Sequence, residues 1–88
     1  MLIVTPFRVI NTNLCQCPIA KQEHFNGFYI MADVGGEEGG EEGCYRIGYY
    51  AAEADRDKVY DELLDRLLKG YEDVRMSEIE EKLGVTPL

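Results

Sequence analysis

The sequence predicts an α+β fold, in which a small antiparallel β-sheet of about three strands is packed by one long C-terminal helix and a short terminal helix. Two observations lead to this prediction. All of the strand patterns lie before residue 52, and a helical period begins at Glu53. The strands therefore precede the helices instead of alternating with them. A chain of 88 residues is long enough for one modest core, so we expect a single domain over residues 1–88.

The N-terminal segment is apolar and β-branched on both sides of Pro6, at residues 2–4 and 7–10. A central strand excludes proline because proline has no N–H to donate, so the segment predicts an edge strand or a bent strand. Residues 11–27 mix polar side chains with a proline and show little periodicity. They predict an irregular connection with at most one helical turn, at residues 20–24.

Two strands of an antiparallel hairpin are predicted at residues 28–34 and 44–51, joined by the loop GGEEGGEEG. Apolar residues at even positions of the first strand alternate with Tyr29, Met31 and Asp33. The second strand alternates two sets, which are Tyr45, Ile47 and Tyr49 on one face and Cys44, Arg46, Gly48 and Tyr50 on the other. A loop this rich in glycine does not specify the register of the two strands. The sequence therefore does not decide which face of the hairpin points to the core.

Residues 53–71 follow a helical period, and their apolar stripe consists of Val59, Tyr60, Leu63, Leu64, Leu67, Leu68 and Tyr71. Lys69 and Gly70 are suited to the end of this helix. A second helix is predicted at residues 78–83, where Ser77 and Glu80 have the spacing of a capping box and Gly84 is a suitable terminating residue.

The net charge of −8 is concentrated in the loop and the C-terminal half. Residues 1–36 are neutral, residues 37–44 contain four acids, and residues 45–88 have a net charge of −4. This balance argues against direct binding of nucleic acid or of anionic lipid, and favours a protein partner with a basic surface. No apolar run has the length of a membrane span and no signal-peptide pattern is present, so we expect no membrane association and a cytoplasmic location.

Catalytic patterns are missing from the sequence. The single histidine, His24, cannot be combined with a serine and an aspartate in the order of a known triad. The glycine loop lacks the lysine and the hydroxyl residue of a phosphate-binding loop, and its four glutamates would repel phosphate. We therefore expect no enzymatic activity and no cofactor.

A zinc site is one alternative that the cysteines leave open. Thiolates and an imidazole suit zinc, and the candidate ligands are Cys15, Cys17, His24 and Cys44. The spacing Cys-x-Cys is shorter than in common zinc motifs, and the fourth ligand comes from a distant strand. Small, half-buried thiols are therefore the favoured interpretation, and three cysteines without dense spacing suit a reducing compartment.

Three aspartates, Asp57, Asp61 and Asp65, recur every four residues and form a row along one ridge of the long helix, called the acidic ridge below. Like charges at this spacing cost about 0.2–0.5 kcal/mol per pair in an isolated helix. Such a row resembles a line of backbone phosphates and predicts contact with a basic groove, although an ordinary solvated helix face explains it as well. Four loop acids extend the acidic surface, and they are Glu37, Glu38, Glu41 and Glu42.

Four tyrosines crowd the predicted hairpin around Arg46, and they are Tyr29, Tyr45, Tyr49 and Tyr50. Tyrosine and arginine are enriched among the residues that anchor protein interfaces. At least half of these tyrosines are expected to pack under the long helix. Those left on the open sheet face, for which we favour Tyr45 and Tyr49, predict a contact surface for a partner or a homodimer interface.

The segment YRIGYYAAE at residues 45–53, followed by Val59 and Leu63, resembles a strand-to-helix joint found in many small phage-type and bacterial proteins of unknown role. In that joint a strand ending in (I/L)-G-x-Y meets a helix opening with (S/T)-E-E. Ala52 stands here in place of the serine or threonine. Residues 76–86, MSEIEEKLGVT, are similar to the opening helix of helix-turn-helix domains. Neither resemblance implies an activity.

Together these features predict a small acidic interaction protein without enzymatic activity. In its most specific form the hypothesis is a phage-encoded inhibitor that binds a host nucleic-acid-binding defence or regulatory protein through the acidic ridge and the tyrosine-bearing sheet face. Two alternatives stay open. One is an oligomeric module that holds a nucleotide-like ligand with its tyrosines and Arg46, and the other is a zinc-stabilised structural domain.

Overall fold

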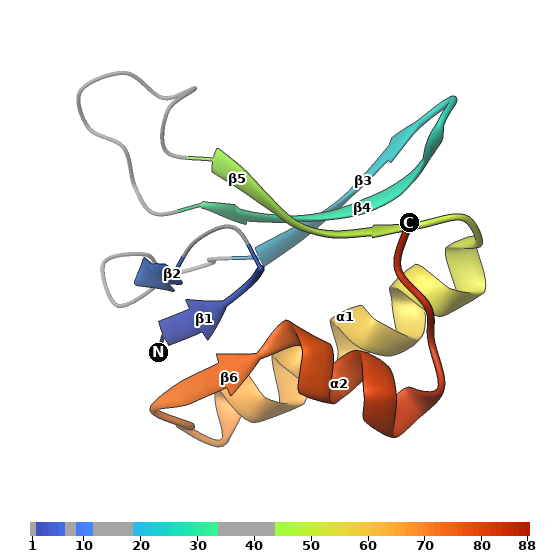
Figure 1. The fold of residues 1–88 in the computed structure, drawn as a ribbon. Coiled ribbons are helices and arrows are strands. Elements are labelled where there is room, and N and C mark those ends of the chain that lie inside the picture. Colours follow the sequence, from blue (N-terminus) through green and yellow to red (C-terminus); the bar gives the residue numbers. More distant parts are fainter. Residues whose placement is uncertain (1, 7–8, 12–18, 34–43) are drawn as a thin grey trace.

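The computed structural model describes residues 2–6, 9–11, 19–33 and 44–88 of the chain. Their elements, in order, are β1 (Leu2–Val4), β2 (Val9–Asn11), β3 (Ile19–His24), β4 (Gly27–Asp33), β5 (Cys44–Tyr50), α1 (Glu53–Leu68), β6 (Asp73–Arg75) and α2 (Met76–Leu83). Strands come first and both helices follow, apart from the short β6 between the helices (Figure 1). The predicted α+β class is confirmed.

The strands form two sheets of three strands each. One sheet is antiparallel, in the order β3-β4-β5, and contains the predicted hairpin. The other has the order β2-β1-β6, with β1 antiparallel to β2 and parallel to β6, so that Ile3 lies opposite Val74. Pro6 lies between β1 and β2, so the expected bend is present, whereas β1 is the central strand of its sheet and not the edge strand that we gave as the other possibility. The pairing of β1 with β6 joins segments far apart in the chain, and no local pattern in the sequence indicates it.

β3 corrects the expectation for residues 11–27. Residues 19–24 form a strand, so the helical turn expected at residues 20–24 was wrong, while residues 12–18 lie outside the described part. Every residue of β3 pairs with β4, from Ile19 opposite Ala32 to His24 opposite Gly27. Backbone hydrogen bonds to β4 and the burial of Ile19 therefore outweigh the weak local preference of this segment.

An irregularity in the pairing of β4 with β5 decides which tyrosines share a face. Gly48 lies opposite Ile30, but Arg46 lies opposite Met31, so Ile47 is an extra residue in β5. Residues directly opposite each other point to the same face of a sheet. The bulge therefore interrupts the alternation that we expected for Tyr45, Ile47 and Tyr49, and that expectation was wrong.

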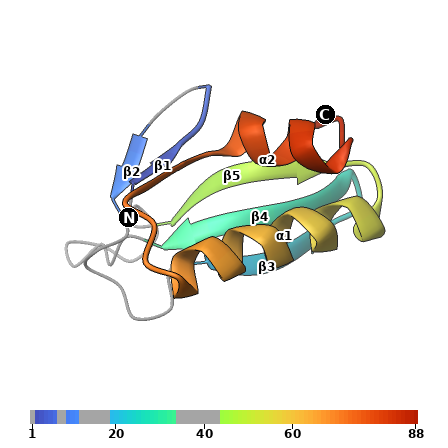
Figure 2. The same cartoon turned by 90° about the horizontal axis from the view of Figure 1, so that it is seen from below.

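Both helices lie on the same face of the β3-β4-β5 sheet, with α1 across β3 and β4 and α2 beside β5 (Figures 1 and 2). Val59 and Leu63 of the predicted α1 stripe are buried against the sheet. The end of the stripe was predicted wrongly, because α1 ends at Leu68, whose side chain is 76% exposed. Gly70, with φ of +78°, then turns the chain away, which leaves Tyr71 exposed too.

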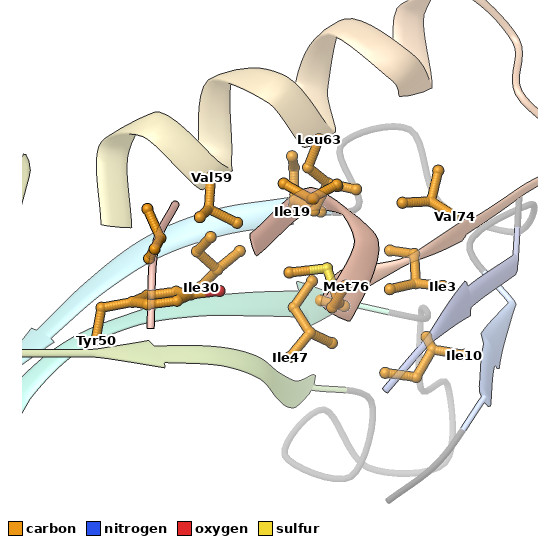
Figure 3. Packing of buried hydrophobic residues seen from close by; sticks show 13 residues of the cluster. Ile3, Ile10, Ile19, Ile30, Ile47, Tyr50, Val59, Leu63, Val74 and Met76 are labelled. Atoms are coloured by element: carbon orange, nitrogen blue, oxygen red, sulfur yellow. The ribbon is translucent and has the colours of Figure 1, made fainter. Parts of the chain in front are cut away.

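A single buried cluster joins the two sheets and the two helices (Figure 3). Its members are Ile3, Ile10, Ile19, Ile30, Ala32, Ile47, Tyr50, Val59, Leu63, Val74, Met76, Ile79 and Val85. Side chains of the second sheet thus complete the same core that α1 and α2 cover, so the β1-β6 pairing is part of the packing of the whole fold.

α2 begins two residues earlier than predicted, at Met76. Arg75 occupies the N-cap position without a side-chain hydrogen bond, so the expected capping box of Ser77 and Glu80 was wrong. Met76 and Ile79 are buried, and packing instead of capping fixes this end of the helix. Gly84 ends α2 as predicted, in a left-handed conformation with φ of +69°.

Gly48 tests the packing under β5. A Cβ atom at this position would lie 2.7 Å from both Cε2 and Oη of the fully buried Tyr50. We expect Gly48→Ala to lower the free energy of unfolding by about 1–3 kcal/mol, because the enclosed ring has little room to move. Urea denaturation followed by circular dichroism measures the change. Unaltered stability would contradict this description of the core.

Candidate functional site

An aromatic patch, formed by Tyr29, Tyr49 and Arg46, lies on the face of the β3-β4-β5 sheet that points away from the helices. Within the described part of the chain, no helix or strand covers this face (Figure 1). Tyr29 and Tyr49 lie opposite each other on β4 and β5, and their rings stack with centroids 4.5 Å apart at an angle of 16°. The guanidinium carbon of Arg46 lies 5.0 Å from the ring centroid of Tyr29 and 5.4 Å from that of Tyr49.

The patch is held in place by its own contacts. The hydroxyl of Tyr49 donates a hydrogen bond to the carbonyl oxygen of Asn26, at 2.7 Å. Loss of contact with water raises the pKa of Tyr49, and hydrogen bonding with Tyr29 raises it further. The hydroxyl therefore stays protonated at neutral pH, and the patch offers aromatic surface and a cation instead of a general base.

The two predicted tyrosine anchors are on different faces of the sheet. Tyr49 belongs to the aromatic patch, whereas Tyr45 lies opposite Ala32 and packs against the core on the helix side. Tyr29 occupies the place beside Tyr49 that we expected for Tyr45. The bulge at Ile47 is the reason, since it shifts Tyr45 to the other face.

The acidic ridge carries fewer uncompensated charges than the sequence indicates. Oδ1 of Asp57 lies 2.8 Å from Nε of Arg56 and 3.1 Å from Nζ of Lys21, and these two hydrogen bonds lower the pKa of Asp57. Asp65 pairs with Lys69 at 3.0 Å. Asp61 is exposed and makes no ion pair with any residue in the described ranges. Only one of the three aspartates is therefore free to attract a cation from a partner.

Arg56 is a structural residue that the sequence analysis missed. Its side chain is buried, and Nη1 donates to the carbonyl oxygen of Gln22 at 3.0 Å while Nη2 lies 3.3 Å from Oε2 of Glu53. The guanidinium also lies over the ring of Phe28. Together with Asp57, Arg56 fastens the start of α1 to the sheet. The available signal was Glu53, three residues before Arg56, a spacing at which side chains on one helix can meet.

The remaining predicted site residues do not form one site. Cys15 and Cys17 lie outside the described residues, as do Glu37, Glu38, Glu41 and Glu42. His24 pairs with Gly27 and Cys44 with Asp33, at opposite ends of β4 and so about 20 Å apart. His24 and Cys44 are therefore too far apart to bind the same zinc ion. Within the part of the chain that the structure describes, no three His, Cys, Asp or Glu residues lie close enough to hold a metal.

A groove of about 640 Å³ runs along the outer edge of β5. Residues 45–49 of β5 line it, as do Thr5 and Pro6, which follow β1. Met76 and Glu80 of α2 line it as well, together with residues 87–88. Sequence reasoning did not identify this groove, because it brings together β1, β5, α2 and the C-terminal segment through tertiary packing alone.

Glu80 connects the groove with the core. Tyr50 is completely buried, and its hydroxyl donates a hydrogen bond to Oε2 of Glu80 at 2.6 Å. Burial raises the pKa of Glu80, although the hydrogen bond from Tyr50 acts in the opposite direction. Burial and the neighbouring carboxylate likewise raise the pKa of Tyr50. Glu80 has no cationic partner among the described residues, so its charge is only partly compensated.

Comparison with known proteins gives no assignment for this α+β domain. No protein-family model matches the chain, and searches of curated proteins and of solved structures found no similar protein. Neither helix in the described residues combines the length and the apolar character needed to cross a membrane. Function therefore has to be inferred from the chemistry of the aromatic patch and the groove.

Replacing Glu80 tests the effect of its buried charge. Because the folded state raises the pKa of Glu80, protonation of this carboxyl favours folding at low pH, and that contribution is lost as the pH rises through the folded-state pKa. Glutamine keeps an oxygen that accepts the Tyr50 hydrogen bond and carries no charge. We expect Glu80→Gln to be more stable than the wild type at about pH 7, with the difference shrinking towards about pH 3.5, where the carboxyl is protonated in both states.

Urea denaturation of both proteins at the two pH values measures this difference. The other titratable groups are the same in both chains, so their contributions cancel in the comparison. A variant that is less stable at neutral pH, or a difference that does not change with pH, would contradict the assigned environment of Glu80.

Proposed function

We propose that this chain is a protein-binding domain without enzymatic activity, which engages a partner with a basic surface through the aromatic patch. One observation supports this most directly. A stacked pair of tyrosines and an arginine occupy a sheet face that no described helix or strand covers. Tyrosine and arginine are the side chains that most often anchor protein interfaces, and here they stand together.

The side chains of the aromatic patch are already restricted in conformation, which favours binding. An interface that immobilises flexible side chains loses about 0.5–1.5 kcal/mol for each of them. Stacking on Tyr29 and the hydrogen bond to Asn26 already restrict Tyr49, so a partner has little ordering to impose on it. The patch thus offers a rigid apolar surface with a cation at its rim.

The excess of acidic residues supports a basic partner. Several exposed carboxylates have no ion pair among the described residues, and they include Asp61, Glu72, Asp73, Glu78 and Glu81. With a net charge of −8, they create a negative field that accelerates encounter with a basic surface. Asp57 and Asp65 add less to this field because cations already neutralise them. In this proposal the acidic ridge therefore attracts the basic partner electrostatically more than it contacts the partner directly.

The narrower form of the proposal is a phage-type inhibitor that acts in the cytoplasm on a nucleic-acid-binding protein. Proteins of that class present basic surfaces, which an acidic domain can cover. A homodimer that uses the aromatic patch as its interface is the alternative.

The second candidate, a nucleotide-like ligand held between tyrosines, has less support. The rings of Tyr29 and Tyr49 already stack on each other at 4.5 Å, which leaves no slot for a base between them. The negative charge of the chain also opposes phosphate groups.

Tyr29→Ala tests the contact role of the patch. We expect this substitution to reduce the amount of partner that co-purifies from cell lysate with the immobilised chain by about tenfold or more, as the loss of an interface anchor does. Tyr71→Ala is the matched control, since Tyr71 is an exposed tyrosine that likewise has an arginine over its ring but lies outside the patch. Quantitative mass spectrometry of the captured proteins measures both effects. Equal capture by the two variants would rule out the patch as the contact surface.

Asp61→Lys tests whether the acidic surface attracts the partner. Asp61 makes no ion pair in the described part of the chain, so its reversal should leave the fold intact, which thermal unfolding can check. We expect slower association with the captured partner at low salt, and a difference from the wild type that fades at about 0.5 M salt because of screening. An unchanged association rate at low salt would show that the acidic surface does not guide binding.

A further inference from the structure

We propose that the groove along the outer edge of β5 binds an extended segment of a partner protein, which pairs with β5 as an additional strand and places a lysine or arginine side chain against Glu80. This site lies at the edge of the sheet and adjoins the aromatic patch on its face, with which it shares Arg46 and Tyr49. It stands independently of the function proposed above.

The edge of β5 is suited to strand pairing. β5 is the last strand of its sheet and pairs only with β4 among the described strands. The amide of Leu88 donates a hydrogen bond of 2.8 Å to the carbonyl oxygen of Tyr49 on the outer side of β5. The chain's own backbone therefore already makes one contact of the kind that an added strand would make, and the partner would pair with the part of β5 before Tyr49. Recognition by strand addition uses such main-chain hydrogen bonds for affinity.

The groove has the size and the walls for an extended peptide. Its volume of about 640 Å³ lies in the range of small-ligand and peptide sites. The segment of β5 that lines it, residues 45–49, is about 13 Å long, which matches four residues of an extended peptide. Pro6 and Pro87, on the walls, have no N–H and so do not compete for the carbonyl groups of β5.

The charge of Glu80 determines which kind of partner segment the groove would bind. Glu80 lines the groove, and its carboxylate accepts one hydrogen bond, from Tyr50, without a cation among the described residues. A partly buried carboxylate is stabilised when a cation lies within a few ångströms of it. Arg46, the one arginine that lines the groove, has its guanidinium over the rings of Tyr29 and Tyr49. An incoming lysine or arginine would therefore supply the missing charge, in keeping with the net charge of −8.

A selection from a displayed library of random dodecapeptides on the immobilised full chain tests this proposal. We expect enrichment of peptides with alternating apolar residues and at least one lysine or arginine. A synthetic copy of the best peptide, titrated into ¹⁵N-labelled protein, should shift the amide signals of residues 45–49 and of α2. The same peptide with N-methyl groups on alternate residues should bind at least about tenfold more weakly, because it cannot donate to β5.

Two variants of α2 separate the charge effect from other causes. Glu80→Gln should weaken binding of the peptide about threefold to tenfold while keeping the hydrogen bond from Tyr50. Glu81→Gln removes the same charge from an exposed neighbour outside the groove and should leave the affinity unchanged. Glu80→Gln should leave the capture of the partner from lysate unchanged, so that failure of this proposal and failure of the aromatic patch can be told apart.

Several results would overturn the proposal. These are no enrichment of peptides, enrichment of peptides without basic residues, or equal affinity of the N-methylated peptide. Sedimentation that shows the chain pairing with a second copy through β5 would also overturn it, because the groove would then be a dimer interface.

Discussion

The hydrogen bond from Tyr50 to Glu80 is the constraint on which much of this structure depends. A fully buried hydroxyl needs a partner, and the partner of Tyr50 is a carboxylate on α2, a helix far away in the sequence. The bond therefore fixes α2 beside β5, where Met76 and Ile79 reach the core. The ring of Tyr50 fills the space next to residue 48. Only glycine fits at this position, because it has no Cβ atom to contact the ring. The groove exists because α2 is held at this position next to the edge of β5.

The bulge at Ile47 is the second determinant, because it distributes the tyrosines between two faces. Before the bulge in the chain, Tyr45 is turned towards the helices. After the bulge, Tyr49 is turned away from them and stacks on Tyr29. One extra residue in β5 thus produces both a filled core and an aromatic patch on the opposite face. Bulges often re-aim side chains next to functional surfaces, and this one does so for the surface that we propose binds the partner.

The sequence predicted the elements whose signal is local. The strands predicted at residues 28–34 and 44–51 correspond to β4 (Gly27–Asp33) and β5 (Cys44–Tyr50), and the helical period from Glu53 gives α1. Contacts between distant segments were not predictable in this way: β6 pairs with β1, and β3 is ordered by β4 although its own pattern is weak. The bulge was missed because period-two reasoning assumes an uninterrupted strand. Likewise, the sequence did not single out Arg56 and placed Glu80 in a capping box, and only packing shows that each is held by specific partners.

The central claim is that a partner contacts the aromatic patch, and the tyrosine side chains report this directly. The chain has six tyrosines, so selective ¹³C labelling of their rings gives a small set of aromatic NMR signals that can be followed with and without the co-purified partner. The account predicts that the ring signals of Tyr29 and Tyr49 shift on binding while those of Tyr60 and Tyr71 do not. Shifts confined to Tyr60 and Tyr71, with Tyr29 and Tyr49 unchanged, would place the partner on α1 and the segment that follows it, and would contradict contact at the aromatic patch.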